Sequence, residues 1–129
     1  MNENKQLILL VESDRALSDL ITMTLQRHGF NTKRVGSQAE ARTILKRSRP
    51  QLVILDLFVP DGSGLDLLKE IQTSRRNIKP NVVVISSFGF QEIVEQAVLA
   101  GARDFVLKPF DIDVFGEKIK KLMINKSVD

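Results

Sequence analysis

The stretch Gln51–Asp56, which reads Q-L-V-I-L-D, decides the predicted fold of this chain. Its four consecutive apolar residues are rich in β-branched types and too few for a helix, so they predict a strand buried on both faces, as in a parallel sheet. Asp56 ends that strand, at the place where open α/β sheets carry their chemistry. Because aspartate is also a common turn residue, the alternative interpretation is that Asp56 only caps a turn into a loop over residues 57–64, where Pro60, Asp61 and Gly62 are turn signals.

Strand and helix signals alternate along the whole chain. Short apolar runs predict strands over residues 6–12, 30–35, 51–56, 81–87 and 104–107, and helical spacing predicts helices that begin near residues 14, 37, 65, 91 and 111. The helix at Ser37 opens with a capping box to Glu40, and Gly29 ends the first helix. The run at 30–35 is polar, which indicates an edge strand. Five alternations predict an α/β doubly wound parallel sheet with five helices.

Composition limits the class of protein. At 129 residues, 43% hydrophobic and 27% charged, the chain is expected to be one soluble globular domain spanning residues 1–129. The absence of cysteine excludes disulfides, zinc-thiolate sites and thiol catalysis. No apolar run approaches the ~20 residues of a membrane span, and the first residues, M-N-E-N-K-Q, lack the layout of a signal peptide. We therefore expect a cytoplasmic protein that does not contact a membrane.

The net charge of +3 raises the question of nucleic-acid binding. Seven basic residues fall between positions 27 and 49, opposed only by Glu40. They are spread over two predicted helices and a strand, and no Gly-rich loop accompanies them, so a solvated basic flank is the favoured interpretation. No helix-turn-helix or catalytic segment follows the last strand and helix. We expect no output domain and no direct nucleic-acid contact.

Polar side chains follow four of the predicted strands. They are Glu12, Ser13 and Asp14 after the first, Asp56 after the third, Ser86 and Ser87 after the fourth, and Lys108 after the fifth. The carboxyl ends of parallel strands meet at one edge, where crowded carboxylates imply a bound cation, and oxygen ligands indicate Mg²⁺. A carboxylate can accept a phosphoryl group while a lysine, a hydroxyl and Mg²⁺ stabilise its charge.

With these residues in place, the chain resembles the receiver domain of two-component response regulators, of the kind represented by the chemotaxis regulators. The resemblance covers nearly the whole chain and rests on V-E-S-D at 11–14, D-L-F-V-P-D-G-S-G at 56–64, S-S at 86–87 and A-G-A-R-D-F-V-L-K-P-F at 100–110. It implies a three-layer, flavodoxin-like fold with strand order 2-1-3-4-5. By resemblance, Asp56 would be the phosphoacceptor, Lys108 the phosphate-contacting lysine, Ser86 the switch hydroxyl and Phe105 the aromatic switch residue.

The metal site departs from the family pattern. The resemblance implies that Glu12, Asp56 and the backbone carbonyl of Phe58 are ligands, but Ser13 stands where the family usually has a second acid that binds Mg²⁺ directly. Glu12 is one methylene longer than the usual aspartate and would reach the cation, while Asp14 is expected to cap the first helix. Losing even an outer partner commonly weakens metal binding ~10 to 100-fold, so we expect a lower Mg²⁺ affinity than is usual for the family.

Two phenylalanines flank the predicted phosphoacceptor. In this family, positions corresponding to Phe58 and Phe88 lie beside the phosphoryl group, where large apolar side chains would exclude the hydrolytic water and prolong the phosphorylated state. The equally favoured alternative is that Phe88 packs on Phe90 as a loop aromatic. The family also implies a cis peptide bond before Pro109.

The leading hypothesis is a signalling switch, not an enzyme beyond self-catalysed phosphoryl transfer to and from Asp56. The expected partners are a sensor histidine kinase or histidine phosphotransfer protein, a downstream effector, and a second copy in a homodimer, with output through the fourth helix, fifth strand and fifth helix. One alternative, which Ser13 favours, is a degenerate receiver that binds partners without phosphorylation. Another, a flavin- or nucleotide-binding protein of the same fold, is disfavoured because V-E-S-D puts acids where an anion would bind.

Overall fold

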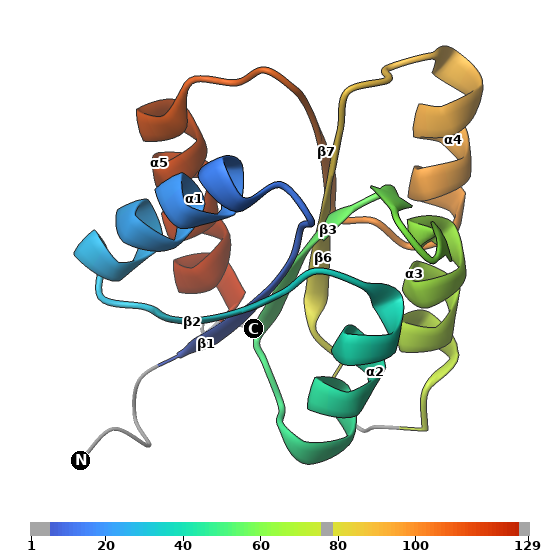
Figure 1. Ribbon diagram of the computed structural model, residues 1–129, viewed down its shortest axis with the longest axis horizontal. Helices are drawn as coiled ribbons and strands as arrows, with labels where there is room; N and C mark the ends of the chain where they lie inside the picture. The colour runs from blue at the N-terminus through green and yellow to red at the C-terminus, as the bar shows by residue number, and fades with distance from the viewer. Residues whose placement is uncertain (1–5, 76–78, 127–129) are drawn as a thin grey trace.

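The computed structural model describes residues 6–75 and 79–126 (Figure 1). The start of the chain, in which the sequence predicts no signal peptide, lies outside the described residues. Within the described residues, no helix is long and apolar enough to cross a membrane.

One five-stranded parallel sheet forms the centre of the molecule. Its strands are β1 (Leu7–Val11), β2 (Asn31–Val35), β3 (Leu52–Asp56), β6 (Asn81–Ser86) and β7 (Asp104–Leu107), in the order β2-β1-β3-β6-β7. Counted along this sheet alone, that is the predicted order 2-1-3-4-5. All five residues of β3 are buried at the centre, and the polar strand β2 lies at an edge, as the sequence predicts.

The sequence predicts a loop after Asp56, and this prediction is wrong in one respect. Two short strands form a hairpin there. Strands β4 (Phe58–Val59) and β5 (Gly62–Ser63) pair antiparallel. Pro60 and Asp61 form the two-residue connection. Gly62 has a φ of +132°, a backbone conformation that residues with a side chain rarely adopt. The predicted turn residues do form a turn. The two strands that it joins have two residues each, which is too short to show the alternating apolar pattern that predicts a strand.

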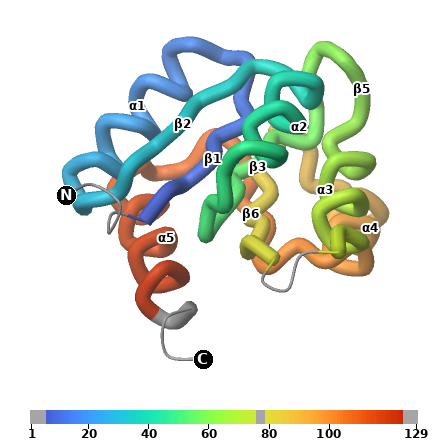
Figure 2. The backbone as a smooth tube through the Cα atoms, turned by 90° about the horizontal axis from the view of Figure 1, so that it is seen from below, coloured from blue at the N-terminus to red at the C-terminus, as the bar shows by residue number. Residues whose placement is uncertain are grey.

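Five helices cover the two faces of the sheet in three layers (Figures 1 and 2). They are α1 (Arg15–Arg27), α2 (Gln38–Arg47), α3 (Gly64–Thr73), α4 (Gln91–Leu99) and α5 (Ile112–Lys126). Helices α1 and α5 pack on one face and α2, α3 and α4 on the other, each with its own cluster of buried aliphatic side chains. Asp14 and Ser37 cap α1 and α2, and Gly29 follows α1 with a φ of +90°, all as predicted.

The central strand contributes buried side chains to the cores on both faces of the sheet. We expect Leu52→Ala, which truncates a side chain with 0% exposure, to lower the free energy of unfolding by about 2–5 kcal/mol because it leaves a cavity between β3 and its covering helices. Leu99→Ala is the matched control, since Leu99 is 87% exposed, and should change stability by less than about 0.5 kcal/mol. Urea unfolding followed by circular dichroism measures both. Equal effects would contradict the assignment of β3 as the core strand.

Candidate functional site

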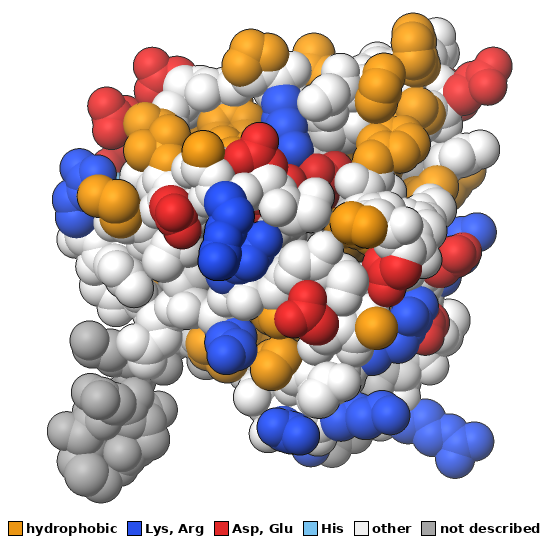
Figure 3. Space-filling view, in the orientation of Figure 1, with side chains coloured by type: hydrophobic (Ala, Val, Ile, Leu, Met, Phe, Trp, Pro, Cys, Tyr) orange, Lys and Arg blue, Asp and Glu red, His pale blue; other side chains and the backbone are white. Residues whose placement is uncertain are grey.

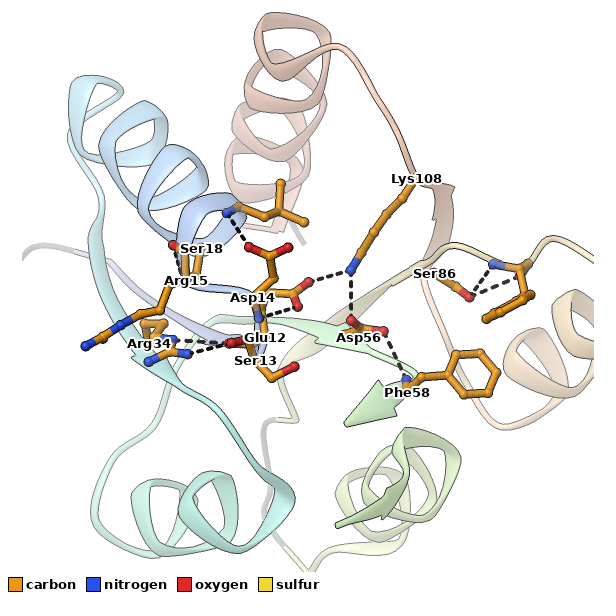
Figure 4. A network of polar contacts seen from close by, with 12 residues as sticks. Glu12, Ser13, Asp14, Arg15, Ser18, Arg34, Asp56, Phe58, Ser86 and Lys108 are labelled. Atoms are coloured by element: carbon orange, nitrogen blue, oxygen red, sulfur yellow. Dashed lines mark hydrogen bonds and ion pairs between the residues drawn. The ribbon is translucent and has the colours of Figure 1, made fainter. Parts of the chain in front are cut away.

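Lys108 joins the ends of three strands at the carboxyl edge of the sheet. Its Nζ lies 2.7 Å from Glu12 Oε1, just after β1, and 2.8 Å from Asp56 Oδ2, at the end of β3 (Figure 4). The predicted convergence of Glu12, Asp56 and Lys108 is therefore present. Glu12 is 1% exposed and Asp56 6%, so the ammonium group balances two carboxylates that have little contact with water.

Backbone amides hold the remaining oxygen of each carboxylate. Glu12 Oε2 accepts the N–H of Asp14 at 3.0 Å, and Asp56 Oδ1 accepts the N–H of Phe58 at 3.0 Å. Both acids are thus fixed by one ammonium donor and one backbone donor each. This arrangement fixes the Asp56 carboxylate at the carboxyl edge of the sheet with one side-chain donor and one backbone donor.

Burial and the charge of the neighbouring groups set the protonation of the cluster. Burial is the largest influence on Glu12 and, with the nearby Asp56 charge, raises its pKa despite the hydrogen bond from Lys108. Burial by itself would lower the pKa of Lys108, but the hydrogen bonds to Asp56 and Glu12 outweigh it and raise that pKa. Lys108 therefore stays charged at neutral pH.

Gly64 is required by the close approach of the chain behind Asp56. Its N–H donates to the carbonyl of Leu57 at 2.7 Å. A Cβ at this position would lie 2.8 Å from the backbone oxygen of Asp56 and 2.9 Å from Leu57 Cα, closer than real side chains come. The glycine thus lets α3 begin directly against the candidate site.

Arg34, at the end of the edge strand, is a site residue that the sequence analysis missed. Its Nε donates to the carbonyl of Glu12 at 3.1 Å and its Nη2 to the carbonyl of Ser13 at 3.2 Å. The guanidinium therefore holds the loop that carries both residues. The Ser13 side chain is exposed, and its hydroxyl takes no part in the Lys108 cluster.

Asp61 is the second residue whose role was missed, because it was interpreted only as a turn signal. Its two carboxylate oxygens accept the N–H groups of Gln38 and Ala39 at 2.9 and 3.0 Å, the first turn of α2. These backbone hydrogen bonds lower the pKa of Asp61. The hairpin that follows Asp56 is therefore fastened to the N-terminus of α2.

Neither predicted switch residue forms a hydrogen bond with the Asp56 side chain in the part of the chain that the structure describes. Ser86 is buried, and its hydroxyl donates to the carbonyl of Phe88 at 3.1 Å and accepts the Phe88 N–H at 3.0 Å (Figure 4). Phe105 is partly buried against the core on the α2–α4 face. The peptide before Pro109 is cis, as predicted.

Three exposed aromatic rings form a row beside the crevice. Phe88 packs edge-on against Phe58 with ring centroids 5.1 Å apart and stacks on Phe90 at 6.2 Å. The contact with Phe90 is the one that the alternative interpretation predicts, and the contact with Phe58 joins the two flanking rings. An effect of these rings on the lifetime of a phosphorylated state stays a prediction.

Comparison with known proteins decides the family. A family model described as the response regulator receiver domain matches residues 8–120 of the chain. The chain belongs to the response regulator receiver domain family. It is thus a receiver domain of a two-component system, as the resemblance indicated.

Relatives of this receiver domain differ in length. It is 29% identical over 127 residues to sporulation initiation phosphotransferase F of Bacillus subtilis, covering 98% of both chains. It is 36% identical over 109 residues to the response regulator protein PilR of Pseudomonas aeruginosa, covering 84% of this chain and 24% of PilR. The crystal structure of the signal receiver domain of a putative LuxO repressor protein from Vibrio parahaemolyticus superimposes with a TM-score of 0.88 at 27% identity, covering 96% and 94% of the two chains.

The oxygen atoms around Asp56 are of the kind that binds Mg²⁺, but they include only two carboxylates and therefore less negative charge than three carboxylates would give. Glu12, Asp56 and the carbonyl of Phe58 offer only oxygen atoms, the ligands that Mg²⁺ prefers. In residues 6–75 and 79–126, however, no three acidic, histidine or cysteine side chains gather closely enough to hold a metal ion. Ser13 stands at the position where the family resemblance implies a further carboxylate.

Removing the Lys108 ammonium group should destabilise the folded state, because the buried carboxylates lose their cationic partner. We expect Lys108→Met to lower the free energy of unfolding by about 3 kcal/mol at pH 7, because Glu12 remains buried without its partner. Losing that hydrogen bond raises the pKa of Glu12 further above its unfolded value. Between the unfolded and the folded pKa of Glu12, the folded state then binds more protons than the unfolded state. The free energy of unfolding therefore falls as pH rises through that range, and the loss caused by Lys108→Met is smaller at pH 5 than at pH 7.

Urea unfolding at pH 5 and pH 7 tests this expectation. The exposed Lys120→Met is the control for loss of one charge, and Lys108→Met/Glu12→Gln should recover part of the loss at pH 7. A loss that is the same at both pH values would show that the Glu12–Lys108 pair does not govern the stability of the site.

Proposed function

We propose that this receiver domain takes a phosphoryl group onto Asp56 from a sensor histidine kinase or a histidine phosphotransfer protein. The observation that carries the proposal is the position of Lys108 Nζ, 2.8 Å from Asp56 Oδ2 in a crevice at the carboxyl edge of the sheet. An ammonium fixed against the carboxylate neutralises charge where a phosphoryl group would bind.

In the proposed phosphoryl transfer, one bond to phosphorus forms and one breaks. A carboxylate oxygen of Asp56 forms a bond to phosphorus as the bond between phosphorus and the donor's imidazole nitrogen breaks, and the electron pair leaves with the imidazole. Lys108 keeps its proton and shifts its contact to the phosphoryl oxygens. Mg²⁺, held by Glu12, Asp56 and the Phe58 carbonyl, would supply further neutralisation of those oxygens.

The switch requires Ser86 to exchange partners. Its hydroxyl is engaged by the backbone of Phe88 at both its donor and its acceptor side. A phosphoryl group on Asp56 offers a charged acceptor, and turning toward it would release the loop that carries Phe88. Phe105 on the neighbouring strand β7 would move with this change. The two states of the switch need differ by only a few kcal/mol for the new contacts of Ser86 to change their populations.

The surface expected to respond consists of α4, β7 and α5. It exposes large apolar side chains, including Leu99 at 87%, Val114 at 64% and Leu107 at 51%. Exposed apolar area of this kind is typical of protein-binding surfaces. An effector, or a second copy in a homodimer, would bind there, and the protein would act as a cytoplasmic switch.

The second candidate function is a receiver that binds its partner without phosphorylation. Ser13 favours it, because one expected metal ligand is missing. The intact geometry of Asp56 and Lys108 favours the phosphorylated switch.

Modification of Asp56 tests the proposal directly. We expect acetyl phosphate to add one phosphoryl group in the presence of Mg²⁺, measured by intact mass, and beryllofluoride to bind in the same condition, measured by fluorine NMR. Asp56→Asn should abolish both signals, while Asp19→Asn, which removes an exposed acid on α1 away from the Lys108 cluster, should retain them. A modification that persists in Asp56→Asn would overturn the acceptor assignment.

Restoring the missing carboxylate should strengthen metal binding. We expect Ser13→Asp to tighten Mg²⁺ binding by at least ~10-fold, because it adds a charged oxygen ligand, and Ser13→Asn to change it far less. The chain has no tryptophan or tyrosine, so calorimetry or amide chemical shifts are the suitable measurements. Equal affinities of the wild type and Ser13→Asp would show that Ser13 does not limit the site.

A further inference from the structure

A groove between α2 and α3 lies away from the phosphorylation crevice. Its volume is about 200 Å³, and its apolar lining comes from Leu45, Leu67, Ile71 and Pro80. No aromatic side chain lines it among the residues the structure describes. Small-molecule sites typically occupy ~300–1,000 Å³, so this groove suits one or two aliphatic side chains better than a small ligand.

The rim of the groove is basic. Lys46 and Arg42 line it together with a single acid, Glu70. Arg42 neutralises that acid through both oxygens, with Nη2 2.7 Å from Glu70 Oε2. Lys46 is exposed and forms no ion pair with a carboxylate of the described residues.

Further cations continue the rim along the amino edge of the sheet. Arg47 ends α2, Arg49 follows it, and Arg75 follows α3; all three are exposed and have no carboxylate partner among the described residues. Figure 3 shows Lys and Arg side chains along the lower edge of the molecule, below α2 and α3. This edge is opposite the one that carries the acidic crevice.

The expected output surface has a different charge pattern. Around its exposed apolar residues it carries exposed acids, Glu92 and Glu95 on α4 and Asp113 and Glu117 on α5, together with the exposed cations Lys120 and Lys121 of α5. The domain therefore presents two apolar faces, one bordered by charges of both signs and the other mainly by cations. Like charges across an interface are unfavourable, so the basic rim of the groove selects an acidic partner, whereas the output surface does not select for one sign of charge.

We propose that the α2–α3 groove docks an acidic amphipathic helix of another protein. One or two aliphatic side chains of that helix fill the groove over Leu67 and Ile71, and its carboxylates face Lys46, Arg47 and Arg49. Charge complementarity selects this occupant, and the apolar floor selects a helix with an aliphatic stripe. A nucleic acid would use the cations but not the floor, which has no aromatic ring for a base to stack on. The docking needs no phosphorylation of Asp56.

The test uses a defined probe and two charge-reversed variants. The probe is a fluorescein-labelled peptide of about 18 residues, long enough to form a helix, with leucines at positions i, i+3, i+4 and i+7, a few glutamates on the other face and alanines elsewhere. The control peptide replaces each leucine by glutamine and keeps the charge. Lys46→Glu/Arg49→Glu reverses the rim, and Lys120→Glu/Lys121→Glu makes the same change of net charge on the exposed side of α5. Circular dichroism verifies that both variants are folded.

We expect the rim variant to bind the probe at least ~10-fold more weakly than the wild type, and the α5 variant to bind it within about twofold. The glutamine peptide should also bind at least ~10-fold more weakly, and amide shifts should map to α2 and α3. Equal losses in both variants, equal binding of both peptides, or binding of the probe weaker than ~1 mM would overturn the proposal. Tighter binding of a DNA duplex, lost in the rim variant, would replace it with a nucleic-acid surface.

Discussion

The ammonium group of Lys108 between Glu12 and Asp56 is the interaction on which the site depends. The two carboxylates are 1% and 6% exposed and come from the ends of adjacent strands, so without a cation their charges would oppose the packing of β1 against β3. Lys108 comes from β7, 96 residues from Glu12 and 52 from Asp56 in the sequence. The cluster can therefore form only when the sheet is complete, which ties the assembly of the site to the assembly of the core.

The walls of the crevice are held mainly by backbone contacts. Gly64 lets α3 begin against Asp56, Arg34 binds two carbonyls of the loop after β1, and Asp61 fastens the hairpin to α2. These contacts leave few side chains free to adjust around the Asp56 carboxylate. Ser86 is different, because its hydroxyl is satisfied only by the backbone two residues away and can exchange that contact for another acceptor. The structure thus places a carboxylate held by two donors and a hydroxyl held only by local backbone contacts on the neighbouring strands β3 and β6.

The sequence predicted those features that depend on local pattern. Apolar runs predict the five strands of the sheet, and a parallel topology by itself places Glu12, Asp56 and Lys108 at one edge. The contacts of Arg34 were not predictable in this way, because they depend on where the edge strand places that side chain in the folded molecule and on carbonyls 21 and 22 residues away. Asp61 looked like a turn residue because its partners, the amides of α2, lie in another element. The orientation of Ser86 is a rotamer, which no pattern of residue types encodes.

The charges along α2 and α3 suit the two helices as well as the basic rim. Asp61 at the N-terminus of α2 and Lys46 and Arg47 in its last turn complement the helix dipole. Arg49 and Arg75 lie one residue beyond the C-caps of α2 and α3, where an exposed cation complements the negative end of each helix while remaining without a carboxylate partner among the described residues. Arg42 has a different task, since it neutralises Glu70 and donates to Gln38, whose backbone N–H is held by Asp61. The basic groove and the hairpin after Asp56 are therefore joined by one chain of polar contacts. A ligand that displaced Arg42 from Glu70 would act on the same helix terminus that holds the crevice in place.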